Sequence, residues 1–130
     1  MRLTLLGSIL LLGCGSAATG PDLRGQWGGE HVQLVVSPTG GVLEYDCASG
    51  TIDERIVPDA SGRLDVRGTH TPGHGGPDVE GEVPEVFAAR YTGTTDGSRM
   101  TVRVVLVDTG TEIGTFSLKR GEDARLLRCL

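Results

Sequence analysis

Residues 63–67 have the sequence Arg-Leu-Asp-Val-Arg, in which apolar and charged side chains alternate without a break. A period of two places Leu64 and Val66 on one face of an extended strand and the charged residues on the other. The same alternation recurs after residue 25, with an apolar face formed by Val32, Leu34, Val36, Leu43, Tyr45, Cys47, Ile52, Ile56, Phe87, Ala89, Tyr91, Met100, Val102, Val104, Leu106, Phe116 and Leu118. No useful stretch has a helical period, so the sequence predicts an all-β fold.

Turn-forming residues separate the alternating stretches. Glycine, proline and aspartate gather near residues 37–41, 59–62 and 108–110, and Asp96-Gly97 is a strong hairpin signal. About eight short strands joined in this way predict an antiparallel up-and-down meander. Such a sheet leaves two exposed edges, which closure into a small barrel removes.

Some segments are expected to interrupt or complete this barrel. Residues 48–50 are expected to break one strand, and residues 51–57 to form a weaker one. Three prolines and four glycines in residues 69–84 predict a long irregular loop. Residues 125–129 are expected to form the last strand, beside the first.

The N-terminus has the pattern of an export signal. One arginine precedes the apolar residues 3–12, a run too short to span a bilayer as a helix. Leu11-Leu12-Gly13-Cys14 resembles the bacterial lipobox, which implies cleavage before Cys14 and lipid on its thiol. An ordinary secretory signal, cleaved near residues 16–18, is the alternative. We therefore expect a signal peptide (1–13), a lipidated cysteine with a flexible tether (14–22) and one β-barrel domain (23–130).

The other two cysteines, Cys47 and Cys129, are expected to pair because exported proteins mature in an oxidising compartment. Two buried free thiols are the alternative. The chain has 17 acidic and 12 basic residues, a net charge of −5, which is poorly suited to nucleic acid. The expected location is the bacterial envelope, and the outer membrane where the host has one.

Trp27 and two arginines near the C-terminus resemble a feature of the calycins, the lipocalin and avidin type of barrel. Those proteins begin with Gly-x-Trp, as Gly25-Gln26-Trp27 does, and place a basic side chain over the ring. The resemblance implies that Trp27 plugs one barrel end, covered by Arg125 or Arg128. The chain also resembles small bacterial lipoproteins with a Trp-Gly-Gly start and a Cys-Leu end, which implies no activity.

A second resemblance is to the lipid-anchored inhibitors of c-type lysozyme. Residues 45–50 (Tyr-Asp-Cys-Ala-Ser-Gly) are similar to their Tyr-x-Cys-x-x-Gly segment. Residues 88–91 (Ala-Ala-Arg-Tyr) are the nearest counterpart of their Ser-Gly-x-x-Tyr inhibitory loop, without the serine and glycine.

The residues that carry chemistry elsewhere form no catalytic motif here, and no enzyme or cofactor is expected. His70 and His74 are weak metal-ligand candidates, since a glycine-rich loop does not preorganise them. The expected function is a lipid-anchored binding module of the envelope, contacting the membrane through its lipid and a protein or small apolar ligand through its domain. An inhibitor of an extracellular hydrolase such as lysozyme, and a barrel binding a small apolar ligand, are the alternatives. A packed interior is favoured over a hollow one.

Overall fold

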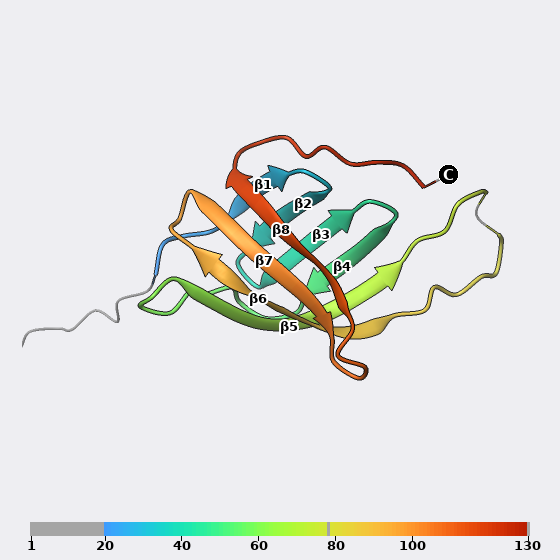
Figure 1. The fold of residues 1–130 in the computed structure, drawn as a ribbon, viewed down its shortest axis with the longest axis horizontal. Coiled ribbons are helices and arrows are strands. Elements are labelled where there is room, and N and C mark those ends of the chain that lie inside the picture. Colours follow the sequence, from blue (N-terminus) through green and yellow to red (C-terminus); the bar gives the residue numbers. More distant parts are fainter. Residues whose placement is uncertain (1–19, 78, 130) are drawn as a thin grey trace, which may run out of the picture.

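The computed structural model describes residues 20–77 and 79–129, which form eight β-strands. The strands are β1 (Gly25–Gly29), β2 (Val32–Ser37), β3 (Gly40–Tyr45), β4 (Ala48–Ile52), β5 (Arg63–Pro72), β6 (Phe87–Thr95), β7 (Arg99–Leu106) and β8 (Glu112–Arg120). Each strand pairs antiparallel with the next, and β1 pairs with β8, so the sheet closes into a barrel (Figure 1). The prediction of an all-β, closed up-and-down meander is confirmed. No helix among the described residues has the length and apolar character needed to cross a membrane.

Alternate side chains of the strands fill the barrel interior, as the period of two predicted. The fully buried apolar residues are Leu23, Trp27, Val32, Leu34, Val36, Leu43, Tyr45, Ile52, Leu64, Val66, Ala89, Tyr91, Met100, Val102, Val104 and Leu118. Phe116 and Ile56 are partly buried and pack against this core. Gly97 has a φ of 92° and follows Asp96 in the β6–β7 hairpin, so that turn is also confirmed.

The predicted break at residues 48–50 is wrong, because these residues belong to β4. Cys47 has a φ of 55°, and with Asp46 it forms a two-residue turn that lets Ala48 pair directly with Tyr45. The predicted strand over residues 51–57 ends at Ile52. Ile52 already pairs with Gly41, the second residue of β3, so β3 does not extend far enough to pair with residues 54–57.

Two other boundaries differ from the sequence expectation. The loop predicted to begin at residue 69 begins after Pro72, because β4 supplies pairing partners for β5 as far as Ala48↔Pro72. Residues 125–129 do not form the last strand. The edge of β1 is already paired with β8 at Trp27↔Arg120 and Gly28↔Lys119, and the C-terminal segment makes one isolated bridge, Glu30↔Arg125.

The barrel has two distinct ends. At the tether end, residues 20–23 lead into β1 close to Pro58 and to the β6–β7 turn. At the opposite end, here called the disulfide end, lie the β3–β4 turn and residues 73–86, the loop between β5 and β6 (Figure 1). The ten-residue strand β5 runs from one end to the other. At about 3.3 Å per residue, the path along β5 between the two ends is roughly 30 Å.

Candidate functional site

Trp27 closes the tether end of the barrel. Its side chain is completely buried, and its Nε1 donates a hydrogen bond of 2.8 Å to the Leu23 carbonyl. The guanidinium carbon of Arg120 lies 4.8 Å from the centre of the indole ring. Arg120 also donates to the carbonyl oxygens of Gly97 (2.9 Å), Arg24 (3.1 Å) and Asp22, so it ties this end together.

The cation over Trp27 is therefore Arg120 and neither of the predicted arginines. Arg120 ends β8, directly opposite Trp27, whereas the chain then leaves the sheet. Arg125 is exposed and forms an ion pair with Glu30 at 2.6 Å, and Arg128 is exposed. The Gly-x-Trp motif identified the correct ring, but the assumption that the last arginines lie on the last strand was wrong.

The interior near the disulfide end holds a pair of tyrosines. Tyr45 Oη donates to Tyr91 Oη at 3.2 Å, and Tyr91 Oη donates to the Thr69 carbonyl at 2.5 Å. Burial raises the pKa of both phenols. Gly50 makes room for this pair, because a Cβ there would lie 2.2 Å from Tyr91 Oη.

The two candidate metal-ligand histidines lie in different environments. His70 is on β5, 4% exposed, with its ring centre 5.9 Å from that of Tyr45. Its buried Nδ1 has no hydrogen-bond partner among the described residues, and burial lowers the pKa of the imidazole. His74 is in the exposed loop, with Nε2 3.7 Å from a Glu82 carboxylate oxygen. The described part of the chain holds no group of three or more metal-ligating side chains.

The barrel interior leaves almost no free volume. Its apolar cavity, lined by residues such as Leu34, Val66 and Met100, amounts to about 10 Å³. That is about the volume needed for one water molecule and far below that of a ligand pocket. The space available for a partner therefore lies outside the barrel.

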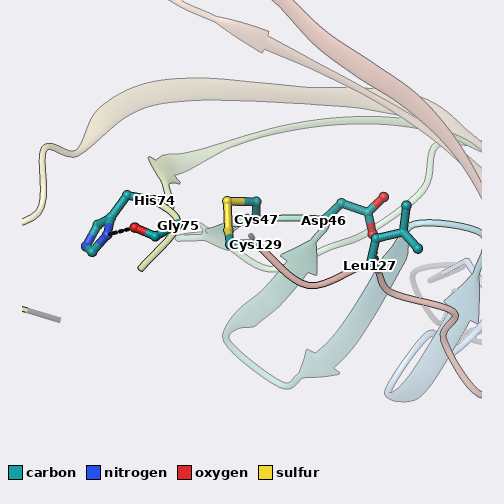
Figure 2. The surroundings of a disulfide bond; sticks show 6 residues. All are labelled: Asp46, Cys47, His74, Gly75, Leu127 and Cys129. Atoms are coloured by element: carbon teal, nitrogen blue, oxygen red, sulfur yellow. Dashed lines mark hydrogen bonds between the residues drawn. A yellow bond between two sulfur atoms is a disulfide. The ribbon is translucent and has the colours of Figure 1, made fainter. Parts of the chain in front are cut away.

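At the disulfide end, Cys47 in the β3–β4 turn is bonded to Cys129, with the two Cα atoms 4.8 Å apart (Figure 2). The disulfide predicted from the sequence is confirmed. It fastens residues 121–129, which we call the C-terminal strap, to a turn 82 residues earlier in the chain.

Further contacts hold the strap on the barrel. The backbone of Arg125 bonds with Gly29 (3.0 Å) and His31 (2.8 Å), and the Leu127 amide donates to the Asp46 carboxylate at 2.5 Å. The same carboxylate pairs with the imidazole of His31. A Cβ on Gly28 would lie 2.2 Å from the Glu122 carbonyl oxygen, so glycine at this position lets the strap approach β1.

Beside the disulfide lies an open groove of about 880 Å³, here called the disulfide-end groove. It lies between the β3–β4 hairpin and the loop of residues 73–86, with Cys129 in its wall. The Gly73 amide donates to the Cys47 carbonyl at 2.8 Å and fixes the start of that loop. Figure 2 shows His74 beside the disulfide, its Nδ1 3.1 Å from the Gly75 carbonyl oxygen.

The groove combines acidic and apolar side chains. Glu44, Glu82 and Glu85 line it, and His74 is its one basic lining residue. Val79 and Val83, also lining residues, are 64% and 86% exposed. This surface was not predicted from the sequence, although the irregular loop contains repeated valine and glutamate.

Comparison with protein-family models, curated proteins and solved structures finds no match to this chain. Cys14 and the rest of residues 1–19 lie outside the described residues. Residues 88–91, the counterpart of an inhibitory loop, lie within β6, and Tyr91 there is 1% exposed. That tyrosine belongs to the core.

Proposed function

We propose that this protein is a non-catalytic binding module tethered to the bacterial cell envelope by lipid on Cys14. The observation that carries the proposal is the contrast between a filled interior and an open groove. The interior cavity is about 10 Å³, whereas the disulfide-end groove is about 880 Å³. A filled barrel with an irregular, exposed loop beside a groove is suited to presenting a surface to another macromolecule.

The position of the groove supports the same function. Residues 20–23 join the tether end, and the groove is at the opposite end, roughly 30 Å away along β5. With lipid on Cys14, the chain leaves the membrane and enters the barrel at the tether end, so the groove lies at the end farther from the point of attachment.

Mass spectrometry and fractionation test the anchor. We expect acyl mass on Cys14 in the mature protein, and release from the membrane in the Cys14→Ser variant. A mature chain that begins after residue 14 and fractionates as a soluble protein would contradict the lipid anchor. That result would not affect the proposed binding role of the groove.

Site-specific photocrosslinking in intact cells tests the binding surface. A photoreactive residue in place of Val83, in the groove, should give adducts of discrete mass. The same residue in place of Val42, 57% exposed on the barrel wall, is the matched control and should give none. Equal yields from both positions, or none from either, would refute a docking role for the groove.

The two alternatives have less support. Inhibition of an extracellular hydrolase is favoured by one observation, the Tyr-x-Cys-x-x-Gly segment, whose β3–β4 turn lines the groove. An assay of c-type lysozyme with the purified protein tests it directly. Binding of a small apolar ligand inside the barrel is not supported, because the interior has no room for one.

A further inference from the structure

We propose that the groove binds a cationic protein segment in which lysine or arginine alternates with apolar side chains. This inference rests on the proposed function, since it names the chemistry of the partner at the same groove. The evidence is the charge of the lining, the exposure of its valines and the way the fold holds the loop in place.

The charge of the groove selects a cationic partner. Glu44 from β3 and both Glu82 and Glu85 from the loop line it, and no lysine or arginine does. The loop adds Glu80, which is also exposed. Asp65 and Glu112, elsewhere on the barrel, are paired with Arg90 and Arg103, whereas the basic group near the groove carboxylates is His74, 3.7 Å from Glu82. The carboxylates of the groove therefore attract a basic segment and repel anionic lipid or nucleic acid.

The valines require apolar side chains on the same partner. Val79, Val83 and Val86 fall within eight residues of the loop, and each is more than half exposed. An apolar centre with a charged rim is the usual composition of a protein interface. A purely polar basic chain would satisfy the carboxylates and leave the valines in water.

Two backbone hydrogen bonds order parts of this loop. The bond from the Gly73 amide to the Cys47 carbonyl fixes its start on the barrel, and the Glu82 amide donates to the Val79 carbonyl at 3.1 Å within it. Cys47 is itself held by its disulfide to Cys129. Order in these parts of the loop reduces the entropy lost on binding.

Peptide binding to the full chain tests the inference. The chain is reconstituted in phosphatidylcholine vesicles, which carry no net charge, and protein-free vesicles serve as the blank. Fluorescence anisotropy follows a short labelled peptide in which lysine alternates with leucine. We expect saturable binding that weakens as salt rises, and weaker binding of a peptide in which serine replaces leucine.

Two double variants with the same change in net charge locate the site. Glu82→Gln with Glu85→Gln should weaken binding about tenfold at low salt, the effect of losing two surface ion pairs. Glu122→Gln with Asp123→Asn, on the C-terminal strap, should change it less than about twofold. Val83→Ser should weaken the leucine peptide and leave the serine peptide unchanged. Circular dichroism confirms that each variant is folded.

The outcomes separate this inference from the proposed function. Equal losses in the two charge variants, or no peptide binding at all, would overturn the cationic partner. Crosslinking from Val83 in cells without peptide binding would keep the groove as a docking surface and refute this partner chemistry. Absence of both signals would overturn the two proposals together.

Discussion

His70 makes the stability of the barrel depend on pH between about 5.5 and 7.5. Its imidazole is 4% exposed, and its Nδ1 has no partner among the described residues. Burial lowers its pKa from the ordinary value of 6.5, so the folded protein keeps the ring neutral where the unfolded chain protonates it. The unfolded state then binds more protons, and stability falls as the pH falls.

The size of the effect follows from proton linkage. At pH 5.5, one unit below the unfolded value of 6.5, protonation stabilises the unfolded chain by RT ln 11, about 1.4 kcal/mol, if the folded ring stays neutral. At pH 7.5 the same term is below about 0.1 kcal/mol. The expected loss of unfolding free energy between these two pH values is therefore up to about 1.4 kcal/mol.

Urea unfolding at several pH values measures this loss. Trp27 is the only tryptophan and is completely buried, so its fluorescence reports the global transition. The control is His70→Phe, which keeps a ring beside Tyr45 and removes the titrating group. Asp65 and Glu112, whose arginine partners lower their pKa values, contribute stability that is lost only under more acidic conditions. If the free energy of unfolding depends on pH equally in the parent and in His70→Phe, His70 is not the source of the pH dependence.

Three further predictions concern stability and use the same urea assay. Replacing Cys47 and Cys129 with serine opens a loop of 82 residues, and we expect a loss of about 2–4 kcal/mol that reduction of the parent reproduces. Arg120→Ala should cost about 1.5 kcal/mol, because it removes the cation over the indole and its bonds to backbone carbonyls, whereas Arg125→Ala should cost about 0.5 kcal/mol. An equal cost for both would contradict the assignment of Arg120. Gly28→Ala should cost about 1–3 kcal/mol and shift the strap, since its Cβ would meet the Glu122 carbonyl; an unchanged midpoint would disprove that close contact.

The fold could be predicted from the sequence because burial follows the two-residue period of a strand. Val32, Leu34 and Val36 alternate with exposed positions in β2 as expected, and the Asp96-Gly97 turn lies where its residues indicated. Strand ends were harder to predict. Ile52 ends β4 because the partner strand begins at Gly40, a limit that local sequence does not contain.

The site could be predicted only in part, because some of its contacts also depend on how distant strands pair. The Cys47–Cys129 disulfide could be predicted from the expected export and from the small number of cysteines. The role of Arg120 depends on the register Trp27↔Arg120 across the closure of the barrel, which joins the two ends of the domain. Arg125, one of the arginines that the motif suggested, lies five residues after Arg120. Local sequence does not show which of these two arginines covers the indole ring.

Two glycines have a role other than forming turns. The glycine clusters were predicted to mark hairpins, and Gly68 and Gly93 lie inside β5 and β6. A Cβ at Gly68 would lie 1.7 Å from the Thr51 carbonyl oxygen, and one at Gly93 would lie 1.7 Å from that of Thr101. Neighbouring strands approach too closely there for any side chain, which is how a small sheet bends enough to close. The glycines within the strands therefore allow the close approach that closure requires, and the apolar side chains of the closed barrel leave an internal cavity of only about 10 Å³.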